Sequence, residues 1–263
     1  MKIRSPVLVS AAVALAALPA TAQHRAPGTD RTDRFNVGYD GRYTFVRLAY
    51  TPITSRQRGG GGFFGGADYQ WNHDWPRADR NFSKILGELT AIEARLDGGN
   101  VLSVGDPEIF KYPVAYLVEP GYMTLTDEEA DNLRNYLLKG GFLIVDDFAD
   151  NFSQGPEWGN FTQYMRMVLP EGHFIQLAPD HPLFNSFFTI ESLDFYHPYR
   201  GVPSKFFGLF EDNDPTKRLL VIANYNNDIG EAWEYSETGF FPVDITNTAY
   251  KLGVNYVMYA MTH

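Results

Sequence analysis

The stretch Gly140-Gly141-Phe142-Leu143-Ile144-Val145-Asp146-Asp147-Phe148 combines a helix stop, a buried strand and two carboxylates. The glycine at position 140 is typical of the residue that ends a helix. The short apolar run that follows predicts a strand in the core of the protein. In open α/β sheets, ligands bind outside the carboxyl ends of the strands. Asp146 and Asp147 therefore stand where such a protein keeps its chemistry, and they are the candidate catalytic residues.

Strands and helices alternate around this stretch. Thr126 and Glu129 have the spacing of a capping box, which predicts a helix leading into Gly140. Further helices are expected at 82–96, 157–169 and 247–261, and further strands at 43–50, 101–104, 113–119, 173–177, 206–210 and 219–223. Residues 224–234 are predicted to form a polar loop. This order predicts an α/β fold with a doubly wound, mostly parallel sheet and helices on both faces.

The N-terminus has the pattern of a secretory signal peptide. Basic residues precede a short apolar run, and Ala20-Thr21-Ala22 offers a small-x-small cleavage site. We expect cleavage after Ala22 and a periplasmic or secreted protein that is not an integral membrane protein, because the apolar run is too short to span a bilayer. Residues 23–42 are expected to form a flexible mature N-terminus, followed by one domain over residues 43–263.

Composition excludes several classes of function. A net charge of −10 without any run of Lys or Arg argues against a nucleic-acid partner. The chain has no cysteine, which excludes disulfides, thiolate metal sites and a cysteine nucleophile. The glycine-rich run 56–66 lacks the Gly-Lys-Ser/Thr of a phosphate-binding loop, so a mobile loop is favoured. Because no H-x-x-x-H or similar spacing supports zinc, we expect neither a metal nor a cofactor.

Further polar and aromatic residues are candidates for binding a small molecule or a carbohydrate. His73 supplies an acid/base group that titrates near neutral pH, the carboxylates and amides of 224–234 offer oxygens to a sugar, a peptide or Ca²⁺, and Trp71, Trp75 and Trp233 are candidate stacking surfaces. Asp and Asn also cap helices and form turns, so each group has a structural interpretation too. The candidate ligand-binding residues are His73, Asp74, Trp75, His181, Asn226, Asn227, Asp228, Glu231 and Trp233.

Several strings are distinctive when they are taken together: residues 43–50, Asp74-Trp75-Pro76, Leu125–Glu129, Gly140–Phe148, Asp180–Phe184, Asn224–Asp228 and Gly253–His263. Through them the chain resembles the bacterial DUF4159 family of the class I glutamine amidotransferase-like superfamily, over about residues 42–263. The resemblance implies a flavodoxin-like α/β sandwich and carries no established activity. Some members look fused to, or encoded near, von Willebrand factor A-type and MoxR-associated membrane proteins, which implies partners in the cell envelope.

The amidotransferases of that superfamily use a Cys-His-Glu triad. Glutaminase chemistry is excluded here because no thiolate is available to attack the amide, and no Gly-x-Ser-x-Gly string replaces it. Two functions remain open: a non-catalytic binding or scaffold module of the envelope, and a hydrolase that cleaves carbohydrate or another envelope polymer with carboxylates at the strand ends. A solute-binding protein is a third hypothesis, disfavoured because such proteins close two lobes around a ligand.

The arrangement of the candidate residues in space separates these functions. If Asp146 or Asp147, His73 and residues 226–234 converge, a ligand site or an enzyme is favoured. If they lie apart, the scaffold module is favoured.

Overall fold

The fold is described from a computed structural model, which defines residues 25–53, 69–150, 155–197 and 201–263. The predicted signal peptide and the glycine-rich run 56–66 lie outside these residues. Within the part of the chain that is defined, no helix has both the length and the apolar character needed to cross a membrane.

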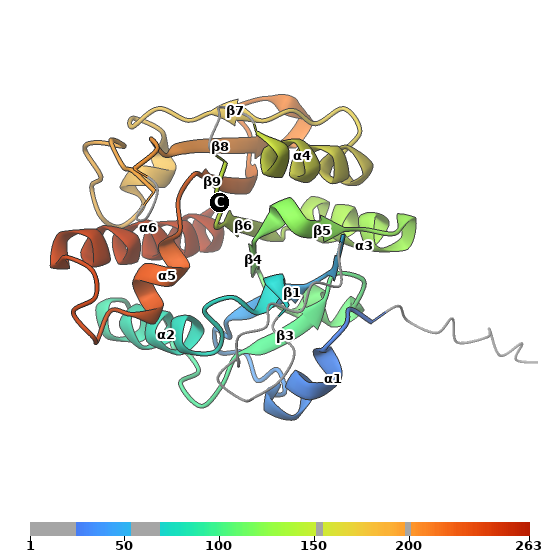
Figure 1. The fold of residues 1–263 in the computed structure, drawn as a ribbon, viewed down its shortest axis with the longest axis horizontal. Helices are drawn as coiled ribbons and strands as arrows, with labels where there is room; N and C mark the ends of the chain where they lie inside the picture. The colour runs from blue at the N-terminus through green and yellow to red at the C-terminus, as the bar shows by residue number, and fades with distance from the viewer. Residues whose placement is uncertain (1–24, 54–68, 151–154, 198–200) are drawn as a thin grey trace, which may run out of the picture.

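The centre of the molecule is a seven-stranded sheet in the order β3-β1-β4-β6-β9-β8-β7 (Figure 1). The first five strands in this order are mutually parallel, whereas β8 runs antiparallel to both of its neighbours. The strands of this sheet are β1 (Val46–Ala49), β3 (Asn100–Ser103), β4 (Val114–Val118), β6 (Phe142–Asp146), β7 (Ile175–Gln176), β8 (Lys205–Phe210) and β9 (Leu219–Tyr225). A separate antiparallel pair is formed by β2 (Thr51–Pro52) and β5 (Met123–Thr124).

Helices cover both faces of the sheet. In Figure 1, α3 and α4 lie on the right of the sheet and α2, α5 and α6 on the left. The helices are α1 (Thr29–Thr32), α2 (Arg77–Leu89), α3 (Asp127–Leu138), α4 (Pro156–Val168), α5 (Ile229–Glu234) and α6 (Val243–Thr262). Short 3-10 turns are η1 (Asp33–Phe35), η2 (Gln70–Asn72), η3 (Pro107–Lys111), η4 (Pro120–Tyr122), η5 (Pro182–Asn185) and η6 (Glu211–Asn213).

The strand β6 divides the core because its side chains alternate between the two faces. Leu143 and Val145 pack with α3 and α4, whereas Phe142 and Ile144 pack with α2, α5 and α6. All five residues of β6 are buried, and the strand pairs with β4 on one side and β9 on the other. The α/β, flavodoxin-like fold that the sequence predicts is therefore confirmed, with the apolar run 142–145 at its centre.

Three helices differ from the sequence prediction. The helix expected at 247–261 is α6, which begins earlier, at Val243. The helix expected at 82–96 is α2, which begins and ends earlier, at Arg77 and Leu89. The segment 224–234, predicted as a loop, turns into the short helix α5 in its second half. Asp228 caps that helix by accepting a hydrogen bond from the backbone amide of Glu231 at 2.9 Å. Capping of this kind favours a helix that the polar composition alone does not predict.

The segment after residue 24 also differs from the expected flexible N-terminus. The amide of Ala26 donates a hydrogen bond to Ser103 Oγ at 2.9 Å. Asn36 Nδ2 donates a hydrogen bond to the carbonyl oxygen of Val101, and Asn36 Oδ1 accepts one from the Val101 amide. These contacts hold residues 25–37 against the edge strand β3.

The capping box that the sequence predicts is present at the start of α3. Thr126 Oγ1 accepts a hydrogen bond from the Glu129 amide at 3.2 Å, and the Glu129 carboxylate accepts one from the Thr126 amide at 2.8 Å. Thr126→Ala should lower the free energy of unfolding by about 1 kcal/mol, since it leaves a helix-end amide without an acceptor. Urea denaturation measures the loss. Thr126→Ser keeps the hydroxyl and should change stability by less than about 0.5 kcal/mol; equal losses in both variants would contradict this role.

Candidate functional site

Adjacent strands of the sheet end in residues with a left-handed backbone. Glu119 follows β4, Asp147 follows β6 and Asn226 follows β9, with φ angles of 52°, 57° and 53°. Asp74, on the loop that precedes α2, has a φ of 64°. Non-glycine residues rarely adopt this conformation, and they gather at functional sites where the surrounding structure enforces it. The carboxyl edge of the sheet thus carries the signature of a site.

His73 lies at the centre of this edge. Its Nδ1 is 2.8 Å from Asp147 Oδ2, 3.7 Å from Asp74 Oδ1 and 3.9 Å from Glu119 Oε1. The His73 side chain is 32% exposed, whereas these carboxylates are almost completely covered. The imidazole is therefore the accessible member of a largely buried group.

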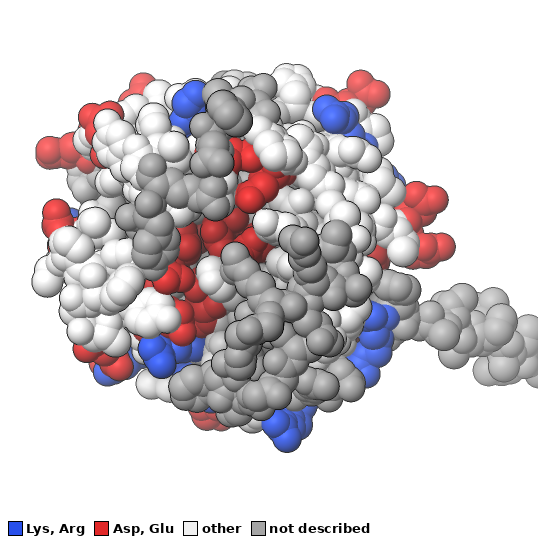
Figure 2. Space-filling model, in the orientation of Figure 1, with Lys and Arg blue, Asp and Glu red and all other residues white. Residues whose placement is uncertain are grey.

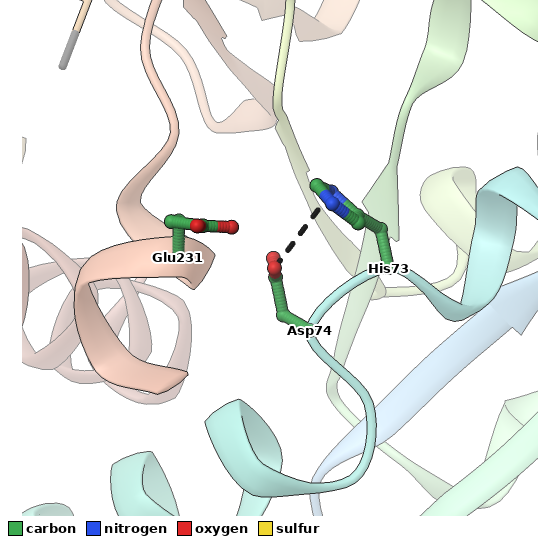
Figure 3. A group of neighbouring side chains, drawn as sticks. All are labelled: His73, Asp74 and Glu231. Atoms are coloured by element: carbon green, nitrogen blue, oxygen red, sulfur yellow. Dashed lines mark ion pairs between the residues drawn. The ribbon is translucent and has the colours of Figure 1, made fainter. Parts of the chain in front are cut away.

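Two residues of the α5 segment complete the group. Potential ligand atoms of His73, Asp74 and Glu231 lie within 4.8 Å of one another, and so do those of His73, Asp147 and Asp228. Figure 3 shows Asp74 between His73 and Glu231, with His73 and Asp74 on the loop before α2 and Glu231 on α5. We call His73, Asp74, Glu119, Asp147, Asp228 and Glu231 the acidic cluster. Figure 2 shows acidic side chains gathered across the middle of the same face, with basic side chains at its margins.

The loop that carries His73 is held by Arg47 of β1. Arg47 is fully buried, and its Nη1 donates hydrogen bonds to the carbonyl oxygens of His73 at 2.8 Å and of Trp71 at 3.3 Å. Its Nη2 lies 2.5 Å from Oδ1 of Asp79, in the first turn of α2. One buried cation thus ties the central sheet, the His73 loop and the following helix together.

Asp146 lies beside the acidic cluster, but both of its carboxylate oxygens accept hydrogen bonds from other parts of the fold. Its Oδ2 accepts hydrogen bonds from the Tyr116 hydroxyl at 2.8 Å and from the amides of Ile229 and Gly230 at 2.9 and 3.0 Å, and its Oδ1 accepts one from Asn224 at 3.1 Å. These contacts join β4, β6 and β9 to the start of α5. The arrangement favours a positioning role for Asp146 over the catalytic role that the sequence predicts, and leaves Asp147 as the catalytic candidate.

The protonation states within this edge follow from burial and charge. Burial opposes a charge on His73, but the hydrogen bond to Asp147 and the nearby carboxylates raise the pKa of His73 to about 10. Burial raises the pKa of Asp74 and of Asp228 well above the usual value, and the charge of Asp147 adds to both effects. Burial also raises the pKa of Asp146 to about 7. The edge therefore places a cationic imidazole among buried carboxyl groups, and burial disfavours the charged form of Asp74, Asp146 and Asp228.

The predicted stacking surfaces are mostly unavailable. Trp71 and Trp233 are 1% and 0% exposed, and Trp233 packs on Phe82 with ring centroids 4.5 Å apart, so their assignment as stacking surfaces is wrong. Trp75 is partly buried and lies edge-on to Phe35. Tyr196, whose side chain borders the same cavity as Asp228, is 62% exposed and is a candidate aromatic surface near this edge. Periodicity and composition cannot distinguish a core tryptophan from a surface one in an irregular segment.

The other predicted ligand-binding residues are used by the fold. His181 lies outside the acidic cluster, where its Nδ1 accepts a hydrogen bond from the Leu183 amide and its ring packs edge-on to Phe210. Asn226 accepts a hydrogen bond from the Asp150 amide, and the side chain of Asn227 accepts one from the Asp228 amide. These asparagines shape the turn that presents Asp228 and Glu231.

Glu119 belongs to the acidic cluster but is absent from the sequence prediction. The signal that could have identified it is present in the sequence, because Glu119 directly follows the buried strand β4, as Asp147 follows β6. Since β4 and β6 are neighbouring parallel strands, the residues after them meet at one edge.

Comparison with known protein families matches residues 45–261 to a domain of unknown function, DUF4159. No curated protein matches the chain in sequence. The matched region includes the complete central sheet and every residue of the acidic cluster. Since this match covers most of the chain, the protein belongs to the DUF4159 family.

Proposed function

We propose that the protein is an exported hydrolase that acts on a carbohydrate or another polymer of the bacterial cell envelope. The observation that carries the proposal is the convergence on His73 of two pairs of carboxyl groups from separate segments of the chain, Asp74 with Glu231 and Asp147 with Asp228. A purely structural role does not require a histidine and several carboxylates to meet at the carboxyl edge of a parallel sheet. The signal-peptide pattern supports the exported location.

Asp147 and Asp228 suit the two roles that glycoside cleavage requires. Asp147 Oδ2 lies 2.8 Å from Nδ1 of the cationic His73, a contact that would hold the carboxyl group in place as a nucleophile. Burial raises the pKa of Asp228, which suits a general acid that holds its proton until the reaction. Their facing oxygens lie within 4.8 Å, and carboxyl groups about 5 to 5.5 Å apart are typical of glycosidases that retain anomeric configuration.

In this mechanism Asp147 attacks the anomeric carbon as the bond to the leaving oxygen breaks, and Asp228 gives its proton to that oxygen. Water then displaces Asp147 from the sugar, and its proton returns to Asp228. The overall reaction consumes one water and leaves both carboxyl groups in their starting states.

A neighbouring cavity gives the substrate a place to lie. It has a volume of about 350 Å³ and reaches Asp228, with Tyr196 and Phe195 on its wall. Aromatic side chains beside a carboxyl group suit a sugar ring, because the apolar face of the ring packs on the aromatic surface while the hydroxyls bond the polar groups.

An envelope scaffold that binds von Willebrand factor A-type or MoxR-associated proteins is the second candidate. It is favoured by exposed apolar side chains before and within the first turns of α6, where Phe240, Val243 and Ile245 are 58%, 74% and 43% exposed. Such side chains suit a protein interface.

The test is a screen of chromogenic glycosides and purified cell-wall polymers with the mature chain. We expect product release with at least one substrate and loss of that activity in the Asp147→Asn/Asp228→Asn double variant. Asn at position 228 still caps α5, so the local fold is retained. The matched control is Asp212→Asn, in the exposed turn between β8 and β9. The proposal fails if no substrate is cleaved, or if the double variant cleaves as fast as the control.

A further inference from the structure

The structure assigns a divalent-cation site to His73, Asp74 and Glu231, and this assignment goes beyond the proposed hydrolysis and does not depend on it. The sequence does not predict this metal site. Ligand motifs that can be read from a sequence span only a few residues, whereas these ligands come from residues 73–74 and 231. Figure 3 shows their side chains directed toward a common region.

Asp74 provides the strongest evidence for this site. Its side chain is completely covered, and no amide, hydroxyl or basic group among the described residues donates a hydrogen bond to its oxygens. Its ion pair with His73 Nδ1 is 3.7 Å long, and the other group beside it is the carboxyl of Glu231. A buried carboxylate without a donor costs several kcal/mol in general, so carboxylates of this kind are paired with cations or coordinate metals. One oxygen of Asp74 lies in the same group of ligand atoms as His73 and Glu231.

The backbone around Asp74 holds it in this position. Its φ of 64° is left-handed, and Gly230 approaches so closely that a Cβ there would lie 2.6 Å from Asp74 Oδ2. Such a conformation persists only where the surrounding structure over-determines it. Asp74 is therefore pressed against the start of α5, one residue before Glu231.

Among the described residues, the nearby buried cation Arg47 donates no hydrogen bond to Asp74. Arg47 is directed to Asp79 and to the carbonyl oxygens of the His73 loop. The surrounding members of the acidic cluster bring two further carboxyl groups, those of Asp147 and Asp228, to this side of the sheet. A bound dication would stabilise the ionised forms of these groups, as metal ions commonly do in carboxylate sites.

The ligand set indicates which cation would bind. One imidazole nitrogen with carboxylate oxygens suits Zn²⁺ or Mn²⁺, whereas Mg²⁺ and Ca²⁺ favour ligands that are all oxygen. Metal bonds of about 2.1 Å place neighbouring ligand atoms about 3 to 3.5 Å apart in a tetrahedral site. The atoms here lie within 4.8 Å of one another, so small side-chain rotations bring them onto one ion.

Calorimetric titration of the chelator-treated mature chain with Zn²⁺, Mn²⁺, Mg²⁺ and Ca²⁺ tests the site directly. We expect one equivalent of Zn²⁺ or Mn²⁺ to bind, and the midpoint of thermal unfolding to rise by about 5 to 10 °C at a hundredfold excess over the dissociation constant. Mg²⁺ and Ca²⁺ should bind at least about tenfold more weakly.

Matched variants locate the ion. Asp74→Asn and Glu231→Gln should each weaken binding by about 10- to 100-fold, since each removes a charged ligand. Asp212→Asn is the control for both, because Asp212 is exposed and has a φ of 53° like that of Asp74. His73→Ala has a control in the exposed His173→Ala. Circular dichroism shows whether each variant is folded. If one of the two carboxylate variants does not fold, the other still tests the site.

The assignment is overturned if none of the four ions binds, or if binding is as tight in Asp74→Asn and Glu231→Gln as in the control. Its failure is distinguishable from failure of the hydrolase. If the protein binds a cation but cleaves no substrate, the cation site stands and the hydrolase proposal fails. If chelator-treated protein cleaves a substrate and binds no cation, the hydrolase proposal stands and the cation site fails.

Discussion

Asp147→Asn should slow product release by about 10²- to 10⁴-fold while the protein stays folded, which is the usual range for losing a carboxylate that acts on the substrate. The variant keeps the shape of the side chain and removes its negative charge. His73 Nδ1, 2.8 Å away, then faces a neutral amide, and no nucleophile remains at the end of β6. Asparagine tolerates the left-handed backbone that position 147 requires, with its φ of 57°.

Steady-state kinetics on the substrate found in the screen measure this effect. The loss should lie in kcat, with KM changed by less than about threefold, because the interaction removed is one made chiefly in the transition state. Asp212→Asn makes the same chemical change in the same backbone conformation, with φ of 53°, at an exposed turn. It should leave kcat unchanged. A variant at position 147 that retains kcat would exclude Asp147 as the nucleophile.

The sequence is sufficient to predict the position of the edge that carries the candidate site. The apolar run Phe142–Val145 is too short for most helices and follows a glycine stop, so it predicts a central strand. The parallel topology then brings the residues after it to the ligand-binding edge. Local capping signals, such as Thr126 with Glu129, also give their helix correctly, because the interaction lies within one turn.

Long-range contacts account for what the sequence does not predict. The pairing of His73 with Asp147 joins residues 74 positions apart, and no spacing rule covers such a distance. The hydrogen bonds that occupy Asp146 come from three other segments, so neighbouring aspartates with the same local signal have different roles. The burial of Trp233 is likewise a property of packing between helices, since α2 and α6 cover it.

Arg47→Met should lower the free energy of unfolding by about 3 to 5 kcal/mol, the usual cost of removing one partner from a buried ion pair. Methionine fills similar volume but donates no hydrogen bonds. Asp79 is then left as a buried carboxylate without its cation, and the carbonyl oxygens of Trp71 and His73 lose their donor. Urea denaturation with linear extrapolation gives the change.

A double-mutant cycle separates the ion pair from the support of the His73 loop. Arg47→Met/Asp79→Leu should recover much of the stability lost by Arg47→Met, because no unpaired charge remains buried. It should not recover product release, since the carbonyl oxygen of His73 still lacks its 2.8 Å hydrogen bond from β1. Arg42→Met breaks an exposed pair with Asp40 and should cost less than about 1 kcal/mol. Full activity in the stabilised double variant would show that Arg47 serves stability alone and does not position His73.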